Sequence, residues 1–175
     1  IMNLFCAQEK ELSLAEICRR TGMHKSIVYR TLVTLESEGW LIRSSLTNKY
    51  MLGMRLLSIS SSILDNMVIR EIALPVMKRL SRLTGETVVL AMYSHGEAIC
   101  IEKIDSENSI KISAQVGKTY PLHVGATGLS VIMGMPRDMQ RKILYERPLK
   151  SFSPTTETDP EKVMEMLATA QQNGY

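Results

Sequence analysis

The sequence has few of the residues that build disulfide frameworks or metal sites. Its 175 residues include three cysteines and three histidines, and none of them stands in a CxxC, HExxH or mixed Cys/His spacing. An odd number of scattered cysteines favours a reduced compartment, so we expect a cytoplasmic protein with neither a metal site nor a cofactor. Cys100 lies in an apolar run, where a buried free thiol is expected.

Long apolar runs are also missing. No segment approaches the ~20 apolar residues of a membrane span, and the N-terminus lacks the pattern of a signal peptide, so we expect no membrane partner. Hydrophobic residues make up 45% of the chain and charged residues 22%. This balance excludes disorder as the main state, and the length suits one large domain or two small ones.

Catalytic motifs are absent as well. The sequence contains no GxSxG, no P-loop and no dinucleotide-binding fingerprint. Glu102 with Asp105, or His123 near Thr127, resemble acid–base pairs, but surface charge and a core histidine explain these residues better. We therefore expect a protein that is not an enzyme.

The net charge of +3 is concentrated at the N-terminal end. The first 55 residues hold eight bases and five acids, whereas the rest of the chain holds thirteen of each. A basic head on a neutral body is typical of a domain that meets phosphates. A chance cluster on a solvated face is the alternative that charge alone leaves open.

After residues 1–12, which have the pattern of the end of a helix, the sequence predicts two short helices joined by a tight turn. Ser13 and Glu16 have capping-box spacing, and the helix that they begin stops near Gly22. The second helix is expected from Lys25 to about Glu38. Two helices joined in this way form a helix-turn-helix.

The second helix has two different faces when it is turned by 100° per residue. One face is expected in the core and carries Ile27, Val28, Thr31, Leu32 and Leu35. The opposite face carries residue types that contact base edges and phosphates in a major groove, namely Ser26, Tyr29, Arg30 and Val33, with Lys25 at the N-terminal flank. A merely solvated helix face is the alternative.

A hairpin is predicted after this helix. Residues 40–43 and 49–52 are short strand-like runs around a polar turn, and Arg43 and Lys49 stand near the ends of the turn. This is the wing of a winged helix. Its bases are expected to contact the DNA backbone without sequence preference.

These residues resemble the winged helix-turn-helix of the IclR-type bacterial transcriptional regulators. The resemblance rests on the order and spacing of several fragments: Leu14-Ala15-Glu16-Ile17, Arg20-Thr21-Gly22, Lys25-Ser26, Arg30-Thr31-Leu32, Leu35-Glu36, Gly39, Tyr50-Met51-Leu52-Gly53 and Arg55-Leu56-Leu57. His24 departs from the pattern, because the family often has proline there.

The remainder of the chain predicts a linker helix and an α+β body. A narrow apolar stripe predicts a helix at 55–66, and in the family the matching helix joins two domains and helps them to dimerise. Another amphipathic helix follows at about 69–84, then strands at 87–93, 98–104 and 110–116. Helices are expected to begin near 127–128 and to span 137–145 and 160–173. Three fragments of this body again resemble the family's sensor domain: Gly85-Glu86-Thr87, Ile101-Glu102-Lys103 and Pro121-Leu122-His123. The fold of that sensor domain is similar to GAF and profilin-like domains.

The stretch Gly125-Ala126-Thr127-Gly128 is the most site-like part of the body. Small residues before a helix let a ligand approach the backbone, and free N–H groups there suit a small carboxylate or carbonyl. The resemblance places an effector site at Gly125, Ala126, Thr127 and Gly128, with Ile112 and Tyr120, and also Leu122 and Met92, as candidate pocket walls. A tight junction with packing glycines, and plain core residues, are the alternatives.

The interpretation is a ligand-responsive transcriptional regulator that binds double-stranded operator DNA. We expect a winged helix-turn-helix at 1–54, a linker helix at 55–67 and an effector-binding domain at 68–175 that is incomplete, because the family continues with further strands. The effector is expected to be a small carboxylate or aromatic acid, and the assembly a homodimer or a dimer of dimers. The alternative is a small-molecule sensing or protein-interaction module whose winged helix binds protein.

Overall fold

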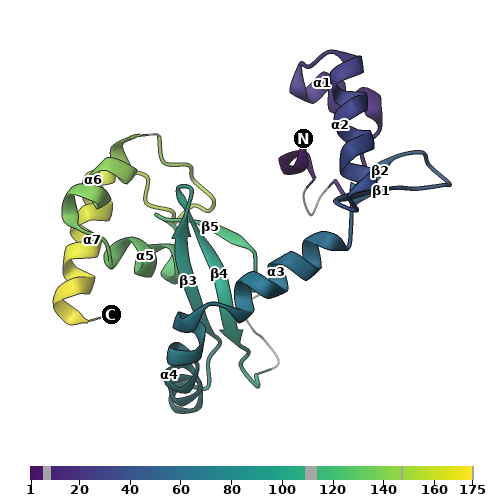
Figure 1. The fold of residues 1–175 in the computed structure, drawn as a ribbon. Helices are drawn as coiled ribbons and strands as arrows, with labels where there is room; N and C mark the ends of the chain where they lie inside the picture. Colours follow the sequence, from purple (N-terminus) through teal and green to yellow (C-terminus); the bar gives the residue numbers. More distant parts are fainter. Residues whose placement is uncertain (6–8, 109–113, 147, 175) are drawn as a thin grey trace. The chain divides into compact units, whose positions relative to one another are not determined.

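The structure is a computed structural model that describes residues 1–5, 9–108, 114–146 and 148–174. Its contacts divide the chain into two compact units, Ile1–Asn66 and Met67–Tyr175, which we call unit 1 and unit 2. Each unit has its own cluster of buried hydrophobic side chains. Helices and antiparallel sheets occur together, which confirms the predicted α+β class (Figure 1).

Unit 1 contains the predicted pair of helices, α1 (Leu14–Thr21) and α2 (Lys25–Ser37). The capping box is formed, since the Ser13 hydroxyl accepts the Glu16 backbone N–H and the Glu16 carboxylate accepts the Ser13 N–H at 2.8 Å. Gly22, in the left-handed region, ends α1. The core of the unit lies between these helices and the hairpin and contains Leu12, Ile17, Val28, Leu32, Leu41 and Tyr50.

The predicted wing is confirmed as strands β1 (Leu41–Arg43) and β2 (Tyr50–Leu52), which pair antiparallel. Leu12 adds an isolated antiparallel bridge to Tyr50, which the sequence did not suggest. The helix expected within residues 1–12 is wrong for the described part, which has only a 3-10 turn, η1 (Met2–Leu4). The Leu12 backbone is used by the sheet, so it is not available for a helix.

Helix α3 (Arg55–Asp65) follows the wing, close to the predicted range. It carries the predicted apolar stripe, but none of its side chains is buried within the chain. Leu57 is 59% exposed and Ile63 is 54% exposed. Much of the stripe is therefore accessible to solvent.

Unit 2 is built on an antiparallel sheet in the order β3-β4-β5, with β3 at Val88–Ser94, β4 at Glu97–Ile104 and β5 at Thr119–Pro121 (Figure 1). The first two strands were predicted. The strand expected at 110–116 is wrong where it can be judged, because 114–116 form no strand, and 109–113 lie outside the described residues. The third strand lies at β5 instead, where Ala98 pairs with Tyr120.

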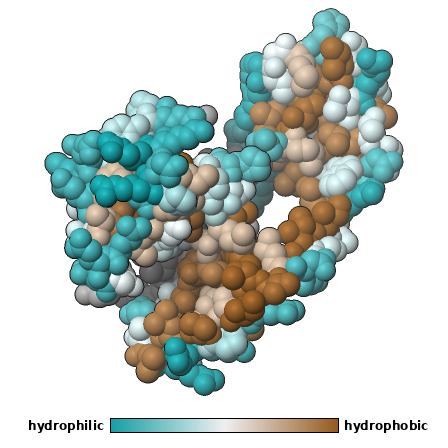
Figure 2. All heavy atoms as spheres, turned by 60° about the vertical axis from the view of Figure 1, so that its left-hand side comes forward, coloured by the Kyte–Doolittle hydropathy of each residue, from teal (hydrophilic) through white to brown (hydrophobic). Residues whose placement is uncertain are grey.

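Helix α4 (Val68–Thr84) packs against β3 and β4 but buries only Met77. Pro75 lies within it without ending it. Six other large apolar side chains of α4 remain exposed: Val68, Ile69, Ile72, Val76, Leu80 and Leu83. Figure 2 shows a continuous hydrophobic surface at the lower end of unit 2, where α4 lies in Figure 1.

Helices α5 (Gly125–Met133), α6 (Arg137–Glu146) and α7 (Pro160–Asn173) group beside the sheet (Figure 1). Their contacts with each other and with β3 and β4 enclose the core of unit 2, which contains Ala98, Leu122, Ile132, Leu144, Val163, Met164 and Leu167. The side-chain amide of Gln140, itself buried, donates to the Ile132, Met133 and Met135 carbonyls at the end of α5. This amide fixes α6 against α5.

Among the described residues, no helix is long and apolar enough to cross a bilayer.

Candidate DNA interface and effector site

The outer face of α2 carries the residues predicted to contact DNA. Lys25, Ser26, Tyr29, Arg30 and Val33 are all exposed, and half of the Tyr29 side chain is accessible. Val28 and Leu32, on the inner face, are fully buried. Helix α2 is therefore anchored by one face and presents the other to solvent, which is the geometry of a recognition helix.

In unit 1, the basic residues of α2 take no part in the ion pairs that the structure describes. Arg20 binds Glu9, with Nη2 to Oε1 at 2.7 Å, and Arg55 binds Glu38 at 2.9 Å. Lys25 and Arg30 form no ion pair within the part of the chain that the structure describes. The exposed face of α2 thus carries positive charge that no acid among the described residues neutralises.

The bases of the wing are more constrained. Arg43 Nε donates to the Asn48 carbonyl at 3.4 Å, and its guanidinium lies 5.6 Å from the centre of the Tyr50 ring. Lys49 Nζ lies 4.0 Å from the Glu16 carboxylate. Hydrogen bonds from the Ser13 backbone N–H and then from its hydroxyl lower the pKa of Glu16, so this carboxylate stays charged beside Lys49. Arg43 and Lys49 both remain accessible at the start of the hairpin turn and its end.

The N-terminus of α5 coincides with the predicted effector loop. The helix begins at Gly125, two residues earlier than expected, and no side chain caps its first turn. Gly125 and Ala126 are exposed and Thr127 is partly exposed, so backbone N–H groups are accessible there.

Gly128 has a packing role. A Cβ built on Gly128 lies 2.1 Å from the Pro121 carbonyl oxygen, so α5 approaches the end of β5 more closely than any side chain allows. The packing alternative therefore holds for Gly128. Gly125, with φ of +66° and open space around it, has no such contact.

The residues predicted to line the effector pocket differ in their burial. Tyr120 packs against the core that also holds Leu122 and Ile132, and its hydroxyl is buried without a hydrogen-bond partner among the described residues. Lys118 Nζ lies 5.5 Å from the centre of the Tyr120 ring. Met92 is 42% exposed. Ile112 lies outside the described residues.

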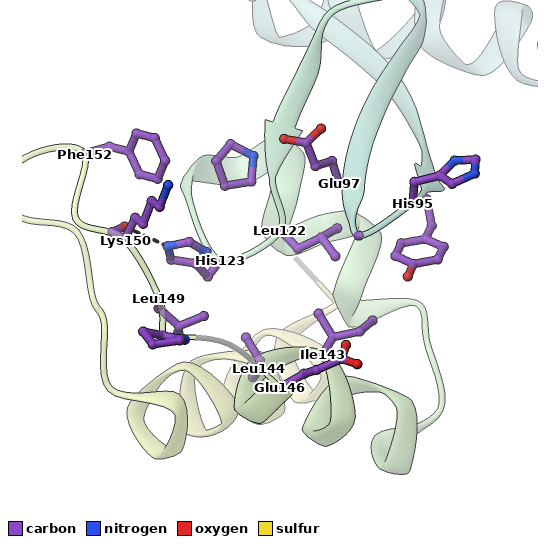
Figure 3. Close-up of a pocket in the computed structure, with 14 residues that line it drawn as sticks. His95, Glu97, Leu122, His123, Ile143, Leu144, Glu146, Leu149, Lys150 and Phe152 are labelled. Atoms are coloured by element: carbon purple, nitrogen blue, oxygen red, sulfur yellow. Dashed lines mark hydrogen bonds between the residues drawn. The ribbon is translucent and has the colours of Figure 1, made fainter. Parts of the chain in front are cut away.

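A pocket of about 590 Å³ lies next to residues 121–123, and no sequence motif indicated it. The β3–β4 turn, residues 121–123, the end of α6 and residues 148–152 line it, and Figure 3 shows Glu97 and His123 directed toward it from different elements. His123 Nε2 lies 2.9 Å from the Lys150 carbonyl oxygen, and its ring is tilted against Phe152 with centroids 6.1 Å apart. None of Gly125, Ala126, Thr127 or Gly128 lines this pocket.

Metal-binding geometry is not found in the described ranges, where no three His, Cys, Asp or Glu side chains group together. Cys100 is buried, as expected, and burial raises the pKa of its thiol. This cysteine is therefore a core residue with little thiolate character.

Family models match both units. The IclR helix-turn-helix domain matches residues 1–44, and the domain described as bacterial transcriptional regulator IclR C-terminal matches residues 61–175. The chain belongs to the IclR family. The family membership that the sequence motifs indicated is thereby confirmed.

Curated IclR-family relatives align along almost all of the chain. The HTH-type transcriptional regulator KipR of Bacillus subtilis is 35% identical over 175 residues, which are the whole chain and 69% of KipR. KdgR of Escherichia coli is 30% identical over 96% of the chain and 64% of KdgR. The chain thus spans about two thirds of the length of these relatives.

Solved structures of IclR-family proteins share the fold. An IclR homolog from Microbacterium hydrocarbonoxydans, in complex with 4-hydroxybenzoate, is 27% identical with a TM-score of 0.76 over 99% of this chain and 71% of its own. The IclR of Thermotoga maritima is 28% identical with a TM-score of 0.65, over 99% of this chain and 70% of its own.

The prediction that Ile27 lies in the core is wrong. The Ile27 side chain is 47% exposed and lines a shallow groove with Arg30, Thr31, Thr34 and Leu35. Helix α1 and the wing pack onto Val28 and Leu32, which lie at the centre of the apolar face. Ile27 lies at the edge of that face, beyond their reach. The helical wheel gives the direction of a side chain but not the width of the partner that covers it.

Proposed function

We propose that unit 1 binds double-stranded operator DNA, with α2 in the major groove and the β1–β2 wing on the flanking backbone. The observation that carries this proposal is the exposed face of α2, in a unit that the IclR helix-turn-helix model matches. On this face Lys25 and Arg30 lie beside Tyr29 and form no ion pair with any residue that the structure describes. Ser26 lies on the same face, and Arg43 and Lys49 add phosphate contacts from the wing.

The DNA-binding function is tested by selecting duplexes from a randomised library with the full chain. Enrichment of one sequence, with affinity that survives an excess of random duplex, supports a sequence-specific regulator. Recovery of no sequence, together with binding of protein partners through α2, favours the alternative of a protein-interaction module.

Unit 2 binds a small-molecule effector at the start of α5. Three features support this site: the first turn of α5 has no side-chain cap, Gly125 and Ala126 are exposed, and the Tyr120 hydroxyl is buried without a partner among the described residues. Thr127 lies in the same turn, and Ile112 stays a candidate. Backbone N–H groups at a helix N-terminus favour a carboxylate, and a relative of similar fold was solved with 4-hydroxybenzoate.

Thermal-shift measurements with a panel of small carboxylates, 4-hydroxybenzoate included, test the effector site. Ala126→Asp places a negative charge where the ligand carboxylate would lie, and it leaves the helix stable because acids are favourable in a first turn. The variant should lose the shift that the best carboxylate gives the wild type, whereas Thr169→Asp on α7 should keep it. A shift retained by Ala126→Asp would place the ligand elsewhere, with the pocket of Figure 3 as the next candidate.

The chain acts as a homodimer, in which a second copy covers the exposed apolar stripe of α3. A dimer places two recognition helices on two half-sites of one operator. In this arrangement residues 55–67 are the linker between the domains at 1–54 and 68–175. An effector that binds one placement of the recognition helices more tightly than another shifts the population toward it and so changes the affinity for DNA.

A further inference from the structure

His24 begins the recognition helix in an unusual way. Its backbone is extended, with φ of −63° and ψ of 140°, and its side chain caps α2 by accepting a hydrogen bond from the Ser26 backbone. The Ser26 N–H reaches His24 Nδ1 at 3.4 Å, and the Ser26 hydroxyl oxygen lies 2.9 Å from the same nitrogen. Ser, Thr, Asp and Asn are the usual residues for this position, and histidine is not among them.

These two contacts determine which ring nitrogen of His24 carries the proton. A backbone N–H can only donate, so Nδ1 must be the acceptor in the contact with Ser26 N. The Ser26 hydroxyl then donates to the same unprotonated Nδ1. In the neutral imidazole one nitrogen is an acceptor and the other a donor, so the proton lies on Nε2.

The same contacts change what Ser26 offers to DNA. The hydroxyl proton of Ser26 is directed to His24, which leaves the hydroxyl oxygen as an acceptor only. The His24 side chain is exposed, and no residue that the structure describes forms a hydrogen bond with Nε2. Of these two side chains, His24 is therefore the one that still has a donor to offer, at Nε2–H.

We infer that His24 is a further specificity-determining residue, whose Nε2–H donates to an acceptor on a base edge in the major groove. This inference rests on the proposed DNA binding of unit 1. The N-terminal residues of a recognition helix are the ones that reach base edges, and His24 directly precedes Lys25 at that end. Acceptors in the major groove are guanine O6 and N7, adenine N7 and thymine O4, whereas cytosine offers only a donor.

The tautomer of His24 gives the first test, with no DNA present. The chain has three histidines, so a long-range ¹H–¹⁵N spectrum of the rings contains few signals, and those of His24 are the ones missing from His24→Asn. The expected pattern is that of a neutral ring protonated on Nε2. A ring protonated on Nδ1 cannot accept the Ser26 N–H and would overturn the inference.

Sequence selection with matched variants gives the second test. Asn caps a helix as well as Ser does, so His24→Asn should keep the thermal stability of unit 1 while removing the imidazole donor. Preference at one base-pair position in each half-site should fall about threefold to tenfold, the usual value of one hydrogen bond. His95→Asn, which replaces another exposed imidazole at a positive φ that Asn tolerates, should keep the wild-type preference.

Each other outcome has a definite meaning. If His24→Asn selects the same sequence as the wild type with the same discrimination, His24 is only a cap and the inference is wrong. If the variant loses affinity equally for every sequence, His24 contacts a phosphate and not a base. If the wild type binds no duplex at all, the proposed function itself fails, and the inference fails with it.

Discussion

At the scale of single residues, Arg30 is the strongest candidate for a DNA contact. It stands in the middle of the exposed face of α2 without an ion pair among the described residues, whereas Arg20 and Arg55 are held by acids. Arg30→Ala should weaken binding of the selected duplex about tenfold or more at fixed salt, because an arginine contact in the major groove contributes on the order of 1–3 kcal/mol. Fluorescence anisotropy measures the affinity. Arg82→Ala, on α4 in unit 2, is the control and should bind like the wild type.

Gly128 is the residue whose size matters most to unit 2. Ala at this position places its Cβ against the Pro121 carbonyl, and neither backbone segment yields easily. Gly128→Ala should lower the free energy of unfolding of unit 2 by about 2–3 kcal/mol, in the range of overpacking substitutions. Urea unfolding followed by circular dichroism measures the change.

Gly134→Ala is the matched control for Gly128→Ala. Its Cβ would lie 3.7 Å from the nearest atom, at a φ of −73° that alanine adopts freely. This variant should differ from the wild type by less than about 1 kcal/mol. Equal stability of both alanine variants would show that α5 does not lie against β5 as described.

Residue-level prediction from the sequence succeeded where a side chain acts locally. The Ser13–Glu16 box needs only four consecutive residues, so its spacing in the sequence was sufficient. The exposure of Ile27 depends on how far α1 and the hairpin reach across α2, and no local pattern records it. For Gly128 the sequence left a ligand role and a packing role open, and the contact with Pro121 in the folded unit decides for packing. The same holds for Tyr120, whose buried hydroxyl is visible only in the folded unit.

At the scale of elements, the capping box makes the stability of α1 depend on pH. Hydrogen bonds from Ser13 lower the pKa of Glu16 below its ordinary value of 4.5 in the folded chain. The ionised carboxylate therefore stabilises the folded state above that value, and this contribution is lost as the pH falls through the lowered pKa. Unit 1 should lose stability as the pH decreases below 4.5.

Trp40, the one tryptophan of the chain, lies in unit 1 and reports its thermal unfolding by fluorescence. Ser13→Ala should destabilise unit 1 by about 1 kcal/mol at neutral pH and should flatten the acid dependence. Glu16→Gln keeps a hydrogen-bonding side chain that does not titrate, so it should also show a flatter profile. An acid dependence unchanged in both variants would contradict the role of the box.

The exposed stripe of α3 predicts the oligomeric state. Leu57→Asp should shift the chain from dimer to monomer in sedimentation velocity at micromolar concentration, because a charge on the stripe opposes its burial. Ser58→Asp, which adds the same charge on the side of α3 opposite the stripe, should leave the dimer intact. A wild type that sediments as a monomer would refute the proposed assembly.

Elements were predicted well where periodicity is strong and less well where pairing is distant. Helices α2, α4 and α7 agree with their predicted ranges within about one residue, since each has a clear apolar spacing or a clear cap. Strand β5 was missed because it has three residues and ends in proline. It exists because β4 offers a free edge, which is a property of the sheet and not of the segment.

At the scale of the whole molecule, the proposal couples two functions that lie in different units. Lys25 and Arg30, which form no ion pair among the described residues, lie on α2 of unit 1, and the uncapped start of α5 lies in unit 2. If the effector changes the affinity for DNA by a given factor, then DNA must change the affinity for the effector by the same factor. Titrations of each ligand in the presence of the other should therefore agree.

The salt dependence of duplex binding tests the central claim most directly. Four basic residues are proposed to contact a phosphate or a nearby base: Lys25, Arg30, Arg43 and Lys49. Each chain should then release about four counterions on binding. The logarithm of the binding constant should therefore fall linearly with the logarithm of the salt concentration, with a slope of about −3 to −4 per chain. A binding constant independent of salt, or no duplex binding at low salt, would contradict the assignment of unit 1 as a DNA-binding domain.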